Sequence, residues 1–505
     1  MTSTIHSAIT DFISSPVSCQ TLLNLLDVFL QNEAERAPPN VHPVPFHHGY
    51  YQVNEELKQK LVDHLKTDTS GESFVSNIIS VALRMRLHRP DSGDIQALCA
   101  SITADQLAGL NTKALFEACN ILQAQREWEK LAFCAQEGAS RSQVSPHQRS
   151  LYCDWFILAS YKMLVPLFEQ NTLTTDHIDG FEAAVKSATQ ALPSDGKNRL
   201  FYKAIVANLR MQLHNAVSLI LKAQKASGDV IALFQRIASF KSPAMLSSNK
   251  SGMLTTLDAD CQHFFAHEQN DKPVLLISTD QRYFDKYVEK MLESYGYWNP
   301  DCLLHLHCVG FSPDNRRLTA LERLYGVKIN HTIDGQTFFS HGDRNFNGYC
   351  AGARYIHLPN YLTRYNKLII TDIDGVIRAD LSKTWTKNPN AILLTGKLLD
   401  PRWRSARLMW EIIAAGSFGI TASSENMRFA TMLSTYLCEQ MTSCTETGAL
   451  FFSTDQIGLL LTYLRCGDDC VFEKCTEFYA QGGNWRFSEQ DGKSIAQENI
   501  DFRKK

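Results

Sequence analysis

The chain has 505 residues, and its 50 Lys and Arg nearly balance its 53 Asp and Glu, which gives a formal net charge of −3. This length exceeds what one hydrophobic core serves, so we expect two or three domains. The balanced charge gives no electrostatic reason to expect a nucleic-acid partner. The start lacks the features of a secretory signal, and no run of about 18 apolar residues predicts a membrane span. We therefore expect a cytoplasmic protein with reduced cysteines and no membrane span.

Residues 1–245 predict an all-α domain, because apolar residues recur three and four positions apart over most of this range. Several helical segments resemble one another, among them 179–196 and 213–229. Aligning Ala184 with Val217 gives a step of 33 residues, close to the period of helix-hairpin repeats. The region therefore resembles a degenerate tetratricopeptide-like solenoid, whose stacked hairpins would form a recognition surface. The alternative is an irregular helical bundle that shields the next domain.

Residues 246–272 lie within a stretch, 239–273, that is rich in Ser, Asn, Asp and Gly, and they predict a linker; residues 273–505 predict an α/β domain. In the latter range apolar strands alternate with helices, among them one expected over 351–365, which predicts a doubly wound, mostly parallel sheet. Ligands of such sheets bind beyond the carboxyl ends of the strands. Residues 278–280 lie at the end of the first of these strands, and residues 372–374 are expected to end a later strand, 367–374.

Two carboxylates, Asp372 and Asp374, flank Ile373 at the end of that apolar strand. Placing two anions there is costly unless a cation compensates them. Carboxylate oxygens are the ligands that Mg²⁺ and Mn²⁺ prefer, so the pattern predicts a divalent metal bridging to phosphates. The alternative is a strand end whose acids cap the next helix.

The segment YNKLIITDIDGVIRADLSKTW (365–385) resembles the DxD segment of glycosyltransferase family 8, which has the GT-A fold. The matching positions are Asp372, Asp374, Asp380, Leu381, Ser382 and Trp385. Gly375 departs from the pattern, because the family usually has a hydrophobic residue there. The resemblance covers about residues 273–465 and implies a GT-A domain that transfers a sugar with retention. It implies a nucleotide-sugar donor, a UDP-sugar, and Mn²⁺ or Mg²⁺ held by Asp372 and Asp374.

The same resemblance implies roles for residues elsewhere in the domain. Asp455 and Gln456 fall near the reaction centre. The residues implied to contact the nucleotide-sugar are Ser278, Thr279, Asp280, Tyr283, Arg354, Asp372, Ile373 and Gly416. For Tyr283, an ordinary place in the core is the alternative interpretation. The acceptor is expected to be a protein or a glycan, recognised by the helical domain.

The third metal ligand is where the chain departs most from the family. Family 8 enzymes place a His near the end of the domain, but no His follows His357 in this chain. Asn484, Asp491 or water could complete the metal shell. Cys466, Cys470 and Cys475 form a cysteine cluster, but their spacing is not that of a zinc motif.

Two other functions fit parts of the sequence. LIITDIDGVI also resembles the first strand of haloacid-dehalogenase-like phosphatases, with Asp372 as nucleophile and Asp374 as acid. The strand–helix units before this strand and the continuation to Trp385 argue against that reading. The third hypothesis is a helical-repeat adaptor that carries an inactive transferase domain.

Overall fold

The structure is a computed structural model that divides into two compact units, Met1–Gln235 and Arg236–Lys505. It describes residues 2–36, 46, 53–67, 73–87, 92–170, 172–190, 196–226, 252–336, 339, 344–385, 387–400, 408–447, 453–475 and 479–480. The predicted order, an all-α region followed by an α/β region with a mostly parallel sheet, is confirmed. Each unit is described by itself.

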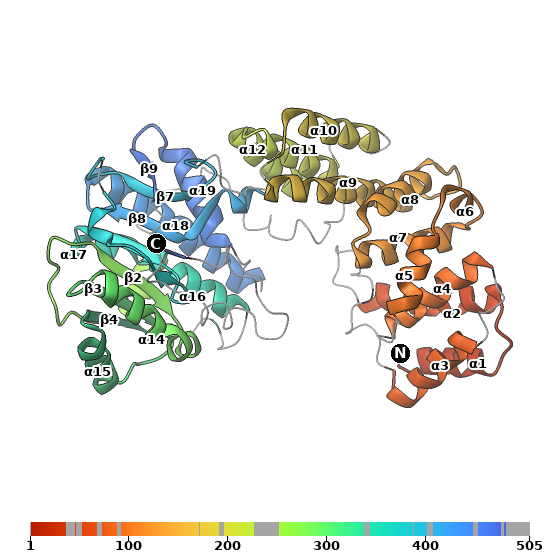
Figure 1. Ribbon diagram of the computed structural model, residues 1–505, viewed down its shortest axis with the longest axis horizontal. Helices are drawn as coiled ribbons and strands as arrows, with labels where there is room; N and C mark the ends of the chain where they lie inside the picture. Colours follow the sequence, from red (N-terminus) through yellow and green to blue (C-terminus); the bar gives the residue numbers. More distant parts are fainter. Residues whose placement is uncertain are drawn as a thin grey trace. The chain divides into compact units, whose positions relative to one another are not determined.

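The first unit consists of helices, most of which pack against the next helix in the chain, while α4 also packs against α2 and α7 (Figure 1). Polar caps mark several of their starts: Ser73, Asn111, Ser145 and Thr174 each accept a backbone N–H of the first turn. The helices are α1 (Thr2–Ile13), α2 (Cys19–Arg36), α3 (Glu55–Thr67), α4 (Phe74–Arg86), α5 (Ser92–Ser101), α6 (Ala104–Ala108), α7 (Thr112–Gln125), α8 (Trp128–Ser140), α9 (Pro146–Glu169), α10 (Thr175–Thr189), α11 (Lys197–Leu209) and α12 (Leu213–Lys225).

Helix α9 is, among the described helices, the one long and apolar enough to cross a membrane by length and composition. Half of its most apolar window is buried inside the unit, as in the core helix of a globular domain. Its Asp154 accepts hydrogen bonds from Tyr202 Oη (2.9 Å) and Asn198 Nδ2 (2.8 Å) of α11. Burial raises the pKa of Asp154 to about 7. The helix therefore holds its neighbours through polar as well as apolar contacts.

A buried charge cluster joins α2, α4 and α7. Arg86 donates to Glu33 (2.6 Å) and to both carboxylate oxygens of Glu117 (2.8 and 3.0 Å). The side chains of Arg86 and Glu117 are fully buried, and that of Glu33 is 6% exposed. Burial raises the pKa of Glu33, and the charge of Arg86 opposes that effect. One guanidinium therefore compensates two carboxylates inside the unit.

The second unit is built on an eight-stranded sheet of order β1-β4-β3-β2-β5-β8-β7-β9. Its strands are β1 (Cys261–Phe264), β2 (Val274–Thr279), β3 (Leu303–Val309), β4 (Lys328–Asp334), β5 (Lys367–Thr371), β7 (Ile392–Gly396), β8 (Ile413–Thr421) and β9 (Phe472–Lys474). A two-stranded sheet pairs β6 (Val376–Ile377) with β10 (Tyr479–Ala480). Strands β2 to β5 are parallel, whereas β1 and β8 run antiparallel to their neighbours β4 and β5.

Helices cover both faces of this sheet (Figure 1). On one face, α14 (Gln281–Trp298) and α15 (Asn315–Tyr325) bury apolar residues of β2 and β3 such as Ile277 and Leu306. The other face packs against α16 (Arg344–Ile356), α17 (Leu358–Arg364), α18 (Ser424–Thr447) and α19 (Thr454–Cys466). The arrangement is a three-layer α/β/α unit.

Three details differ from the expected elements. The range 246–272, expected as a linker, contains α13 (Gly252–Ala259) and β1, the edge strand paired with β4. The single helix expected over 351–365 is divided between α16 and α17, because Pro359 begins a new helix. Strand β5 ends at Thr371, so the DxD residues form the turn that follows the strand instead of its last positions.

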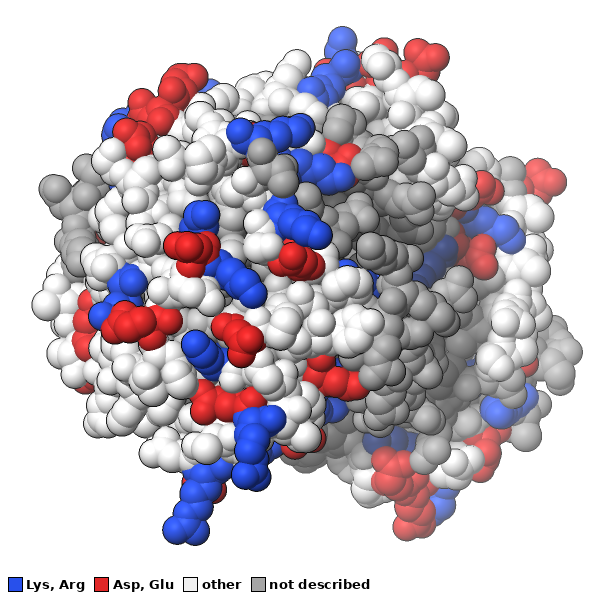
Figure 2. Space-filling model, turned by 60° about the vertical axis from the view of Figure 1, so that its left-hand side comes forward, with Lys and Arg blue, Asp and Glu red and all other residues white. Residues whose placement is uncertain are grey.

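Charged side chains are mixed on the face of the molecule that Figure 2 shows, where Lys and Arg stand among Asp and Glu. This distribution agrees with the small net charge of the chain. A ligand of this face would therefore be selected by local groups rather than by a field of one sign.

Replacing Arg86 with Met is expected to destabilise the helical unit by about 3–5 kcal/mol, because two buried carboxylates lose their only shared cation in the cluster. Chemical denaturation of the full chain, followed by far-ultraviolet circular dichroism, measures the effect. Lys113→Met is the matched control, since it removes an ion pair to Asp27 whose side chains are 46% and 50% exposed. An exposed pair of this kind contributes about 0–1 kcal/mol. Equal losses in the two variants would contradict the prediction.

Candidate functional site

The carboxyl ends of β2 and β5 define the place where a ligand would bind. From β2 the chain continues to β3 and β4 on one side, and then returns to β5 on the other side. The ladder between β2 and β5 ends at the pair Leu276–Ile370, although β2 stays paired with β3 as far as Thr279. The two strands therefore separate where their side chains become polar. Such a reversal of strand order is where open α/β sheets bind ligands.

A buried arginine neutralises the first acid of the DxD turn. Arg354, near the end of α16, forms an ion pair with Asp372 (Nη2–Oδ1 2.6 Å) and donates from Nη1 to the carbonyl of Thr371 (2.6 Å). The side chain of Arg354 is 2% exposed, and that of Asp372 is 28% exposed. Burial lowers the pKa of Arg354, but the carboxylates of Asp372 and Asp455 outweigh that effect and the net pKa is raised. The guanidinium is therefore held charged against the turn.

The other two residues of the turn are buried. Ile373 belongs to the hydrophobic core between the sheet and helices α14 and α15, and the side chain of Asp374 is almost fully buried. A carboxylate that is removed from water in this way needs compensation. Asp372 and Asp374 supply oxygen atoms of the kind that Mn²⁺ and Mg²⁺ prefer, so the turn fits the expected metal. Asn484 and Asp491, the candidates for a third ligand, lie outside the described residues.

Asp455 completes the charged group from the first turn of α19. Burial raises the pKa of its carboxyl, the charge of Arg354 lowers it and the charge of Asp372 raises it, and the net pKa is raised. Its Oδ1 accepts the backbone N–H of Gln456 at 2.9 Å. The sequence-predicted residues Arg354, Asp372 and Asp455 are thus within electrostatic reach of one another.

Strand β8 brings small residues to the same end of the sheet. In its antiparallel ladder with β5, Ser417 stands opposite Thr371. The hydroxyl of Thr371 donates to the carbonyl of Gly416 at 2.9 Å, and Tyr355 Oη donates to the carbonyl of Ala415. The structure therefore places Gly416 next to the start of the DxD turn.

The residues predicted on β2 and α14 have mostly local roles. Asp280 caps α14 by accepting the N–H of Tyr283 at 2.7 Å, and Thr279 donates to the carbonyl of Asp280 at 3.0 Å. Tyr283 packs against Tyr287, with ring centroids 5.3 Å apart, and against the core beneath the sheet. Ser278 differs, because its Oγ is buried and has no hydrogen-bond partner in the described part of the chain. Of these four residues, Ser278 is the best placed for a ligand.

The segment from Asp380 to Trp385 is explained by local structure. Asp380 caps a short 3₁₀ helix, Leu381–Lys383, by accepting from the N–H (2.9 Å) and the hydroxyl (2.6 Å) of Ser382. Trp385 donates from Nε1 to the carbonyl of Ala391 at 2.8 Å and lies against Gly419 of β8. These contacts fix the course of the chain after the DxD turn.

No protein-family model and no curated protein matches the chain. Among solved structures, the chain is similar to the apo form of the glycosyltransferase GlyE of Streptococcus pneumoniae TIGR4, with 15% identity and a TM-score of 0.27, over 41% of this chain and 46% of that one. It is also similar to the bifunctional glycosyltransferase WbbM, with 13% identity and a TM-score of 0.26, over 68% of this chain and 66% of WbbM. Likenesses this distant carry no argument about activity.

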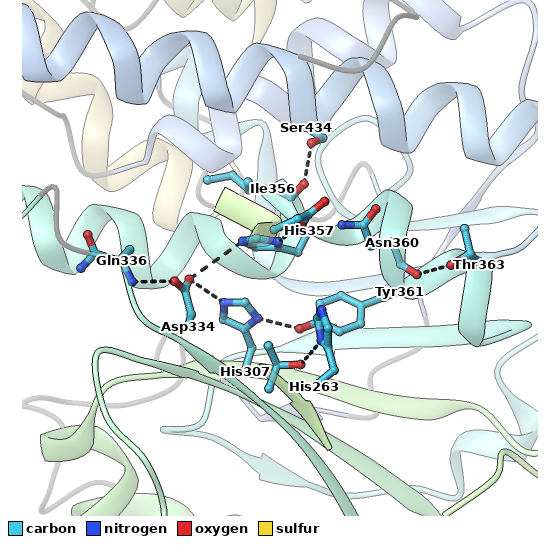
Figure 3. A network of polar contacts seen from close by, with 12 residues as sticks. His263, His307, Asp334, Gln336, Ile356, His357, Asn360, Tyr361, Thr363 and Ser434 are labelled. Atoms are coloured by element: carbon cyan, nitrogen blue, oxygen red, sulfur yellow. Dashed lines mark hydrogen bonds and ion pairs between the residues drawn. The ribbon is translucent and has the colours of Figure 1, made fainter. Parts of the chain in front are cut away.

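A polar network that the sequence analysis missed lies on the face of β3 and β4 that packs against α16 and α17 (Figure 3). His307 bonds Tyr361 Oη through Nδ1 (2.6 Å) and Asp334 Oδ2 through Nε2 (2.9 Å). Burial lowers the pKa of His307. We therefore assign a neutral ring that donates from Nε2 and accepts from Tyr361. The signal in the sequence is the alternation of His305 and His307 in an apolar strand, which puts both on one face.

Replacing Asp455 with Asn is expected to stabilise the chain more as the pH rises. The folded-state pKa of Asp455 is raised, so its contribution to stability is present below the unfolded-state pKa and is lost as the pH rises through the folded-state pKa. Asn stays neutral and can still accept the N–H of Gln456. Thermal unfolding from about pH 4 to about pH 8 should show a growing difference between variant and wild type.

Asp314→Asn is the control for this comparison. Asp314 also accepts a backbone N–H, that of Arg316 at 3.0 Å, but it is exposed at the start of α15. Its variant should therefore show little change with pH. A difference at Asp455 that stays constant over the same range would contradict the proposed cost of burying its charge.

Proposed function

We propose that this chain is a metal-dependent glycosyltransferase that takes its sugar from a nucleotide-sugar, a UDP-sugar, and acts in the cytoplasm. The observation that carries the proposal is the convergence of Arg354, Asp372 and Asp455 on the turn at the carboxyl end of β5. This turn lies where the strand order reverses, beside the separated ends of β2 and β5. A diphosphate is stabilised by cationic groups that are held in place away from water, and the buried guanidinium of Arg354 is such a group.

Each residue would have a definite part in the transfer. Asp372 and Asp374 would hold Mn²⁺ or Mg²⁺, which when bound neutralises charge on the departing diphosphate. Arg354 is already ordered by its bonds to Asp372 and Thr371, so it can add positive charge there without reorganising. The carboxylate of Asp455 would stabilise the positive charge that develops on the sugar ring. Ser278, whose buried hydroxyl has no hydrogen-bond partner in the described part of the chain, would bind the nucleotide.

We propose that the helical unit recognises a protein or glycan acceptor as a tetratricopeptide-like repeat domain. Support comes from a cavity of about 580 Å³ between α4 and α5. Polar side chains line it, among them Asn77, Ser80, Arg84 and Asp94. The Arg84–Asp94 ion pair of 2.6 Å fixes these two groups, so hydroxyls or amides of a ligand would meet an ordered polar wall.

The phosphatase hypothesis has less support from the geometry. The ion pair of Asp372 Oδ1 with the guanidinium of Arg354 at 2.6 Å makes this carboxylate a weaker nucleophile for a phosphorus atom. Three strands of the same sheet, β2 to β4, also precede β5 in the chain and would have no role in that reaction.

Asp374→Ala is expected to abolish Mn²⁺-dependent binding and slow hydrolysis of UDP-sugars, with a loss of at least about 100-fold, because it removes a metal ligand. A thermal-shift screen of nucleotide-sugars with and without Mn²⁺ measures binding, since a ligand of the folded state raises its apparent stability. Asp380→Asn is the matched control, because it changes an acid of the same segment to a residue that can keep the cap.

The same preparations separate the alternatives. Mg²⁺-dependent hydrolysis of simple phosphomonoesters that is lost in Asp372→Asn would replace the proposed transferase with a phosphatase. Failure of the wild-type chain to bind any metal or nucleotide-sugar would instead leave the helical-repeat adaptor with an inactive transferase domain.

A further inference from the structure

Cys261, Asp334 and His357 bring a thiol, a carboxylate and an imidazole together at the carboxyl end of β4. One ligand atom of each lies within 4.8 Å of the other two, and His357 Nε2 is 3.9 Å from Asp334 Oδ2. Cys261 and Asp334 are directly opposed in the antiparallel ladder of β1 and β4, which puts their side chains on the same face. His357 comes from the start of α17. The cluster therefore joins three elements of the unit.

His357 is the residue that points to a cation. Its Nδ1 lies 2.8 Å from Asp258 Oδ1, and because a carboxylate only accepts, Nδ1 must carry a proton. In the neutral ring Nε2 then presents a lone pair. The side chain is 1% exposed, and Nε2 has no hydrogen-bond partner among the residues that the structure describes. Figure 3 shows this nitrogen turned toward Asp334, at a distance too long for a hydrogen bond.

Neighbouring residues orient His357 and Asp334 by hydrogen bonds, as is usual for the ligands of a metal site. A metal-binding His usually donates its other nitrogen to a carboxylate, and Asp258 fills that place. Asp334 is oriented by Tyr349 Oη (2.7 Å), by His307 and by the backbone N–H of Gln336 (3.0 Å). These contacts fix the position of the Asp334 carboxylate beside Cys261 and His357.

The acidic surroundings of the cluster also favour a cation. Asp258 and Asp334 both lie within ion-pair distance of His357, at 2.8 and 3.9 Å, so two carboxylates face one imidazole. A divalent ion bound by Cys261, Asp334 and His357 would offset this negative charge.

We propose that Cys261, Asp334 and His357 bind one zinc-class transition-metal ion, with a fourth position open to water or another ligand. Thiolate and imidazole favour zinc, whereas the two carboxylates at 372 and 374 favour Mn²⁺ or Mg²⁺. Ligand atoms about 2.0–2.3 Å from zinc lie about 3.3–3.8 Å apart in a tetrahedron, so the cluster needs to close by about 1 Å. The ion would cross-link β1 and α17 to β4. This inference does not rest on the proposed glycosyltransferase activity.

The test uses the full chain, stripped of metal with a chelator. Elemental analysis after incubation with Zn²⁺ and desalting should find about one zinc per chain that chelation removes. Titration with Co²⁺ should give a near-ultraviolet thiolate-to-cobalt band and visible bands of a four-coordinate ion. Cys261→Ser should lose the thiolate band, and His357→Gln should weaken zinc binding at least about 100-fold. Circular dichroism of each metal-free variant checks its fold.

Two controls locate the ion. Cys19→Ser removes a partly exposed thiol of the helical unit, and Asp374→Ala removes the DxD acid, and both should keep one zinc per chain. Failure of the stripped wild type to bind zinc, or a thiolate band that survives in Cys261→Ser, would overturn the proposal. So would loss of zinc in either control. Loss of UDP-sugar binding with retained zinc in Asp374→Ala would uphold both proposals separately.

Discussion

The buried guanidinium of Arg354 is the interaction on which the carboxyl edge of the sheet depends. It bonds Asp372 and the carbonyl of Thr371, and its charge acts on Asp455. The guanidinium thereby bonds α16 to the end of β5, and its charge reaches the first turn of α19. Without it, the partly exposed Asp372 and the buried Asp455 would repel each other with no charge from Arg354 to compensate them. The site is therefore part of the fold's own charge balance.

Much of this architecture could be predicted from the sequence because its signals are local. Apolar strands such as Val274–Thr279, buried on both faces, read as continuous apolar runs. Amphipathic helices that connect consecutive strands make those strands parallel. The carboxyl ends of the parallel strands then lie at one end of the sheet, which places Ser278 and Asp372 there. The resemblance to glycosyltransferase family 8 added Arg354 and Asp455. The structure brings these two together with Asp372, although their roles stay predictions.

What the sequence could not supply depends on long-range contacts. Cys261 lies in a short, largely exposed strand inside a polar stretch, and nothing near it marks a pairing with Asp334. His357 stood out only as the last His of the chain, because Asp258, which orients its ring, is 99 residues away. The strand that was expected to continue through Asp374 ends at Thr371, because an apolar run marks the start of a strand more clearly than its end.

The two ends of the large sheet also bear on how the molecule behaves in concentrated solution. Both outer strands are short: β1 has four residues and β9 has three. An outer strand exposes unpaired backbone groups that can recruit another chain, and long flat ones promote aggregation. Here each offers a template of only a few residues, while the longer apolar strands β2, β3 and β8 have a neighbouring strand on both sides. The strand order thereby protects a highly apolar sheet from self-association.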